Sequence, residues 1–132
     1  MSETSKHMSL RKWTSLNYPN LRVYLLGHPD SQKPFDLDFH TAPVLKRTIL
    51  EEDFSVIIDL AEVKYMDSTG LANLVIAAQK SDKFFALILP AKGEHAMQIY
   101  RIIQLTGVED ALRRYPTFQA AFSAYCDYNT IE

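Results

Sequence analysis

The sequence is poor in cysteine and glycine, and it has no long apolar run. Cys126 is the only cysteine, which excludes internal disulfides and cysteine-based zinc sites. Four glycines are present, and none belongs to a phosphate-binding glycine loop, so the sequence carries no recognisable machinery for nucleotide hydrolysis. No apolar run approaches the roughly 20 residues that a membrane-spanning helix requires.

The charge balance offers no basic field to an anionic partner. The chain has 14 basic and 16 acidic residues, which gives a net charge of −2 with histidine neutral. We expect no direct binding to nucleic acid or to a membrane surface, because both attract concentrated basic charge. The first ten residues, "MSETSKHMSL", lack the apolar segment of a secretory signal. A cytoplasmic protein that needs no cofactor is therefore expected.

Length and composition predict one globular domain. A chain of 132 residues with 47% apolar residues is long enough to bury a core and is not typical of a disordered protein. Residues 1–8 are polar and irregular, so we expect a flexible leader there and the folded domain over residues 9–132.

Apolar runs between turn signals predict the strands. Two extended runs lie on either side of a turn signal at Asn17–Asn20, and they are expected to form an antiparallel hairpin. The run "SVIIDLAEVKYM", residues 55–66, is expected to be extended and buried. The strands predicted after the hairpin cover residues 54–60 and 84–90, and a loop is predicted at residues 28–36.

Four segments have the apolar period of a helix. They are residues 42–53, 69–80, 93–107 and 116–126. Thr41 is expected to cap the first helix, and Gly107 to end the third. Strands that alternate with helices form parallel βαβ units. We therefore predict an α/β fold with one mixed sheet of about four to five strands, flanked by about four helices.

The segment "VKYMDSTGLANLV", residues 63–75, places an acid, two hydroxyls and a glycine at the start of a helix. Asp67, Ser68 and Thr69 are all residues whose side-chain oxygens cap helices, so capping alone is one interpretation. A phosphorylation site is the other. A phosphate on Ser68 would lie where free N–H groups and the helix dipole favour negative charge, and it would bring ~1.5–2 negative charges to the surface.

Catalytic interpretations find little support in the sequence. A hydrolase nucleophile at Ser68 would need glycine two residues earlier, where Met66 stands. The four histidines lie in unrelated segments, and no two of them have the i, i+4 spacing of a helical metal-ligand pair. We expect neither an enzyme nor a metal site.

Three segments, in the same order, resemble parts of one known domain. Residues 56–75, "VIIDLAEVKYMDSTGLANLV", are similar to its central strand, phosphorylation turn and following helix. Residues 37–45, "LDFHTAPVL", resemble the segment that leads into its first helix, and residues 102–110, "IIQLTGVED", resemble the end of its third helix. That domain is the STAS family, shared by sulfate transporters and bacterial anti-sigma-factor antagonists. The matches extend over roughly residues 10 to 125.

The resemblance implies partner switching. In this family an unphosphorylated antagonist binds a serine-kinase anti-sigma factor, the kinase phosphorylates the serine that follows an aspartate, and a PP2C-type phosphatase restores it. By resemblance, Ser68 is the phosphoacceptor. The implied partner-binding residues are Asp38, His40, Thr41, Asp67, Thr69, Gly70 and Leu71. A monomer or weak dimer is expected.

One segment departs from the family pattern. Antagonists pass from the strand that ends near Leu26 straight into the acidic loop, whereas here residues 28–35, "HPDSQKPF", intervene. We expect this insertion on or near the docking surface, where it bears on the choice of partner. The alternative function is a STAS scaffold or accessory module in a stressosome-like or transporter-associated complex. The intact Asp-Ser-Thr-Gly turn at residues 67–70 favours the antagonist.

Overall fold

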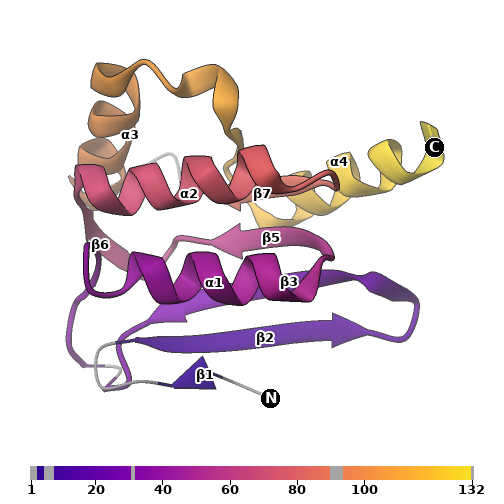
Figure 1. Ribbon diagram of the computed structural model, residues 1–132, viewed down its shortest axis with the longest axis horizontal. Coiled ribbons are helices and arrows are strands. Elements are labelled where there is room, and N and C mark those ends of the chain that lie inside the picture. Colours follow the sequence, from indigo (N-terminus) through magenta and orange to yellow (C-terminus); the bar gives the residue numbers. More distant parts are fainter. Residues whose placement is uncertain (1–2, 5–7, 31, 90–93, 132) are drawn as a thin grey trace.

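The computed structural model describes residues 3–4, 8–30, 32–89 and 94–131. Its strands are β1 (Glu3–Thr4), β2 (Ser9–Ser15), β3 (Tyr18–Gly27), β4 (Phe35–Leu37), β5 (Ser55–Asp59), β6 (Val63–Met66), β7 (Phe85–Ile88) and β8 (Arg113–Tyr115). Its α-helices are α1 (Ala42–Glu52), α2 (Ser68–Lys80), α3 (Glu94–Thr106) and α4 (Phe118–Ile131) (Figure 1). None of the helices in these ranges is long and apolar enough to span a membrane.

Six strands form one mixed sheet in the order β1-β2-β3-β5-β7-β8. The strands β1, β2 and β3 are antiparallel neighbours, whereas β3, β5, β7 and β8 run parallel. A parallel return requires a crossover connection, and α1, α2 and α3 lie in these connections. The predicted hairpin, the parallel βαβ units and the mixed sheet flanked by helices are all confirmed.

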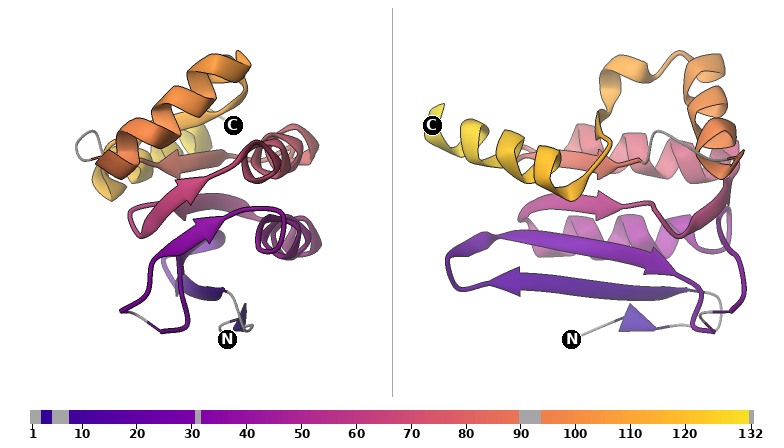
Figure 2. Two further views of the ribbon diagram at one scale, coloured as in Figure 1. Left: turned by 90° about the vertical axis from the view of Figure 1, so that its left-hand side faces the viewer. Right: turned by 180° about the vertical axis from the view of Figure 1, so that it is seen from behind.

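Helices cover both faces of this sheet (Figure 2). The helices α1, α2 and α3 contribute to the core cluster on one face, and α4 contributes to the cluster on the other. Along β5, Val56 and Ile58 belong to the first cluster and Ile57 to the second. Successive side chains of a strand point to opposite faces, so a strand covered on both sides needs apolar residues at every position.

Residues 55–66 form two strands, where the sequence predicted one extended run. The chain turns after β5, and Val63 N donates a hydrogen bond to Leu60 O at 3.0 Å. Beyond this turn β6 leaves the main sheet and pairs in parallel with β4, which makes a separate two-stranded sheet. The strand β4 overlaps residues 28–36, which were predicted to be a loop. Each of these short strands supplies backbone partners to the other.

Within residues 1–8, which were predicted to form a flexible leader, the structure describes Glu3, Thr4 and Met8. Glu3 and Thr4 pair with β2, and Met8 is buried in the core. These three residues belong to the fold, which corrects the predicted boundary at residue 9. Residues 1–2 and 5–7 lie outside the described part of the chain.

A polar network holds the end of α1 against the sheet. The Tyr24 hydroxyl donates a hydrogen bond to the Glu52 carboxylate, which also lies 3.2 Å from Lys12 Nζ and 3.7 Å from Arg22 Nε. Burial raises the pKa of Glu52, but the hydrogen bonds from Tyr24 and Lys12 and the charges of Lys12 and Arg22 outweigh it, so the pKa is lower than its ordinary value. With its C-terminal end fixed in this way, α1 holds its N-terminal loop in a defined place.

Candidate functional site

The two segments that the sequence singled out lie side by side in the structure. In the β4–β6 pair, Leu37 is opposite Met66. Asp38 and Asp67 follow these residues directly, so both carboxylates stand at neighbouring strand ends. Figure 1 shows α1 and α2 starting at this same end of the molecule. We call the surface of residues 38–40 and 67–69 the two-loop face.

Asp67 is the residue that caps α2. Its backbone is extended, with φ −95° and ψ 179°, and its Oδ1 accepts a hydrogen bond from Gly70 N at 2.7 Å. Ser68 is the first helical residue, and its side chain is exposed, as is that of Thr69. Among the described residues the Ser68 hydroxyl has no hydrogen-bond partner. Capping therefore explains Asp67 and leaves the Ser68 hydroxyl without a structural task.

Gly70 lets the two loops touch. It is buried, and a Cβ at this position would lie only 2.1 Å from the carbonyl oxygen of Leu37. Leu71 is buried too, with 2% of its surface exposed. The resemblance implied that Gly70 and Leu71 belong to the docking surface. In the structure both residues are buried, because this part of α2 packs against the end of β4, and their part in docking stays a prediction.

The loop between β4 and α1 is held by reciprocal hydrogen bonds. Asp38 Oδ1 accepts from the backbone nitrogens of His40 at 2.9 Å and Thr41 at 3.3 Å. Thr41 Oγ1 accepts from Asp38 N at 3.0 Å and donates to Asp36 O at 2.9 Å. Thr41 occupies the N-cap position of α1, but its hydroxyl makes no capping bond and its side chain is buried. The predicted N-cap position of Thr41 is confirmed, but its hydroxyl holds the loop instead of capping the helix, and its predicted contact with a partner stays a prediction.

Two exposed aromatic residues were not predicted from the sequence. Phe39 is 61% exposed, and its ring centroid lies 4.1 Å from that of His40. Tyr65, on β6, is 46% exposed. For Phe39 the available signal was an aromatic residue between two polar loop residues. Exposed aromatics beside polar groups are typical of protein–protein interfaces.

Gln98 of α3 clamps the backbone of β6 next to the cap residue. Its Nε2 donates to Met66 O at 2.9 Å, and its Oε1 accepts from Met66 N at 3.1 Å. One side chain thus satisfies both backbone groups of the residue before Asp67. The two-loop face is therefore supported from three elements, β4, β6 and α3.

Replacing Gln98 by alanine is expected to lower the melting temperature. The change leaves the Met66 N–H and C=O without partners next to buried apolar side chains, at a cost of about 1–3 kcal/mol, or about 3–10 °C. Thermal unfolding followed by circular dichroism measures the shift. The matched control is Gln104→Ala on the same helix, where the side chain is exposed. Equal shifts in the two variants would show that the clamp contributes nothing.

The chemistry of this region is that of a binding surface. Asp38 and Asp67 each accept hydrogen bonds from backbone N–H groups, and the exposed residues of the two-loop face carry two hydroxyls, a phenyl ring and an imidazole. Within the described ranges, no group of three or more histidine, cysteine, aspartate or glutamate side chains could hold a metal ion.

The sequence of this chain matches the model of a known protein family. Residues 34–121 match the family model of the STAS domain. The chain belongs to the STAS domain family. The matched residues contain β4, the two-loop face and three parallel strands of the sheet. The predicted family is therefore confirmed.

Two Listeria proteins are similar in sequence to this chain. Proteins named anti-sigma-B factor antagonist from Listeria monocytogenes and Listeria innocua are each 32% identical over 83 residues, which cover 58% of this chain and 69% of theirs. The STAS antagonists are regulatory binding proteins and not enzymes, and this confirms the class predicted from the sequence.

Solved structures agree on the fold. An anti-sigma factor antagonist from Mycobacterium paratuberculosis superposes with a TM-score of 0.72 at 22% identity, covering 94% of this chain and 98% of that one. The phosphorylated Bacillus cell fate determinant SpoIIAA superposes with a TM-score of 0.55 at 15% identity, covering 87% of this chain and 97% of that one. At these identities the likeness shows the fold alone.

Proposed function

We propose that this chain is an anti-sigma-factor antagonist whose binding to a serine-kinase anti-sigma factor is controlled by phosphorylation of Ser68. The observation that carries the proposal is the Ser68 side chain, exposed at the first position of α2 with its hydroxyl unpartnered among the described residues. The names of the Listeria relatives support the antagonist role. A PP2C-type phosphatase would restore the binding form, and such a role belongs in the cytoplasm.

A phosphate at Ser68 suits a switch because the fold tolerates it and a partner does not. The start of α2 presents free N–H groups and the positive end of the helix dipole, so the monomer accommodates an anion there. The same group adds ~1.5–2 negative charges beside the carboxylates of Asp67 and Asp38. A partner that binds the two-loop face would then meet a concentration of negative charge that is absent from the unmodified protein.

The partner surface in this proposal consists of side chains that are exposed or half-buried. Asp38, His40, Asp67 and Thr69 remain candidate contacts, and Phe39 joins them as the exposed aromatic residue. Residues Thr41, Gly70 and Leu71 position this surface from beneath. The proposal thus separates residues that would touch the kinase from residues that hold the loops.

Phosphosite mapping tests the proposal. Wild type, Ser68→Ala and Thr69→Ala are incubated with ATP and a serine-kinase anti-sigma factor from the same organism, and the products are analysed by mass spectrometry. We expect one phosphate on Ser68 in wild type and in Thr69→Ala, and none in Ser68→Ala. The Thr69 variant is the matched control, because its hydroxyl is exposed on the neighbouring residue. Phosphate on Thr69, or no phosphate on any residue, would refute the assignment.

A further inference from the structure

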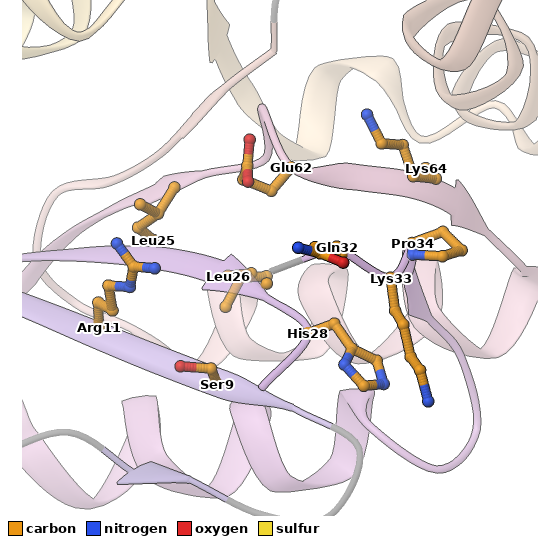
Figure 3. A pocket seen from close by; sticks show the side chains of 11 residues that line it. Ser9, Arg11, Leu25, Leu26, His28, Gln32, Lys33, Pro34, Glu62 and Lys64 are labelled. Atoms are coloured by element: carbon orange, nitrogen blue, oxygen red, sulfur yellow. The ribbon is translucent and has the colours of Figure 1, made fainter. Parts of the chain in front are cut away.

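A cationic hollow of about 280 Å³ lies at the carboxyl end of β3, on the side of the insertion (Figure 3). Three cations line it: Arg11 from β2, Lys33 from the insertion and Lys64 from β6. Glu62 is the one acid in the lining. The chain as a whole carries a net charge of −2, so this excess of positive charge is a local feature.

The insertion is folded back on itself beside the hollow. Asp30 N donates a hydrogen bond to His28 Nδ1 at 2.9 Å, and Asp30 Oδ1 accepts one from Gln32 N at 3.0 Å. Lys33 N donates to Asp30 O at 3.0 Å. These bonds close a turn that contains Gln32 and Lys33, two of the residues that line the hollow. The segment that departs from the family pattern therefore builds part of its wall.

The hollow is continuous with the two-loop face. A second hollow of about 140 Å³ is lined by Asp36, Asp38 and His40, and it shares His28 and Pro34 with the first. The surface therefore changes from mainly cationic to acidic across the insertion. A partner bound at Asp38 and His40 would extend over His28 to reach the cations.

We propose that the cationic hollow is a second docking site for the same partner, which receives an acidic segment of the serine-kinase anti-sigma factor. This inference rests on the proposed function. It assigns the insertion a task, because Lys33 and the wall beside it exist only through those residues.

The form of the hollow favours a protein segment over a small anion. Small-molecule sites are mostly apolar, enclose most of the ligand and measure about 300–1,000 Å³. Here Arg11, Lys33 and Lys64 are all exposed, so the hollow would leave a small anion open to water instead of enclosing it. Exposed charges at the rim of an interface select partners and accelerate association. An acidic loop on a folded partner fits that pattern.

Charge reversal tests the second docking site. The variants Arg11→Glu, Lys33→Glu and Lys64→Glu are compared with Lys83→Glu, which makes the same charge change just before β7, at the opposite end of the parallel strands. Affinity and association rate for the serine-kinase anti-sigma factor are measured at about 0.05 M and about 1 M salt. We expect each of the three variants to bind about threefold to tenfold more weakly at low salt, mainly through slower association, and like wild type at high salt. Lys83→Glu should bind like wild type at both.

Equal affinities for the three variants and Lys83→Glu would overturn the second docking site. Saturable micromolar binding of ATP or inorganic phosphate to wild type, lost in Lys33→Glu, would also overturn it in favour of a small-anion site. Ser68→Glu separates this inference from the proposed function. If Ser68→Glu abolishes binding while the three hollow variants bind like wild type, the second docking site is refuted and the proposed function stands. If Ser68→Glu binds like wild type, the proposed function is refuted, and the second docking site, which rests on it, is refuted too.

Discussion

Ser68→Glu is expected to weaken binding to the serine-kinase anti-sigma factor at least tenfold while leaving the melting temperature close to that of wild type. The side chain is exposed at the first position of α2, so a carboxylate is accommodated in the monomer and is even favoured by the helix dipole. In the complex the same carboxylate would be buried without a partner, at a cost of several kcal/mol. Each ~1.4 kcal/mol is a tenfold loss of affinity.

Two control variants isolate the charge. Ser68→Gln has nearly the size of the glutamate variant without its charge, and Ser68→Ala removes only the hydroxyl. Ser68→Ala should fold normally, because Asp67 and not Ser68 caps α2. It should bind the kinase like wild type and resist phosphorylation. Calorimetry and thermal melts on the same four proteins give both quantities. If Ser68→Glu bound the kinase as tightly as Ser68→Gln, negative charge at position 68 would not be the cause of the loss of affinity.

Gly70→Ala is expected to lower stability, although a helical glycine replaced by alanine normally gains about 0.5–1 kcal/mol. The added Cβ would lie 2.1 Å from Leu37 O and 2.9 Å from Leu37 C, and both are backbone atoms that cannot rotate away. The end of β4 and the start of α2 must then separate. We expect a loss of about 1–3 kcal/mol in the free energy of unfolding. Because the separation also moves Asp38 away from Ser68, affinity for the kinase should fall as well.

Gly27→Ala is the matched control for this prediction. A Cβ at Gly27 would meet only the Cβ of Glu62, at 4.0 Å, which is an ordinary contact. Urea unfolding of both variants measures the difference. If Gly70→Ala were as stable as wild type, the close approach of the two loops would not be a constraint on this sequence.

The central strands and the end of α3 followed from the sequence because their causes are local, whereas α4 was predicted at residues 116–126 and runs from Phe118 to Ile131. Unbroken apolar runs predicted β3 and β5, which are interior strands of the sheet. Gly107 was predicted to end the third helix, and it has a φ of +71° that suits glycine. In each case the deciding residues lie within a few positions of the feature, so no distant partner had to be known.

Short strands could not be predicted in this way. The strands β4 and β8 have three residues each, and β8 consists of "RRY", which has no apolar alternation. Each becomes a strand because a neighbour far away in the sequence offers its backbone groups, β6 in one case and β7 in the other. Local propensity decides little at such edges, and pairing decides most.

In the candidate site, too, some features were predictable from the local sequence and others depended on tertiary contacts. The sequence by itself singled out the candidate residues: the acid, the two hydroxyls and the glycine of residues 67–70, and the acidic loop around Asp38. Only the tertiary structure decided that β4 pairs with β6, and this pairing brings the two loops together. It also turned Thr41 and Gly70 inward and left Ser68 exposed. The sequence gives the type of each residue directly, whereas the burial of a residue depends on which distant segment packs against it.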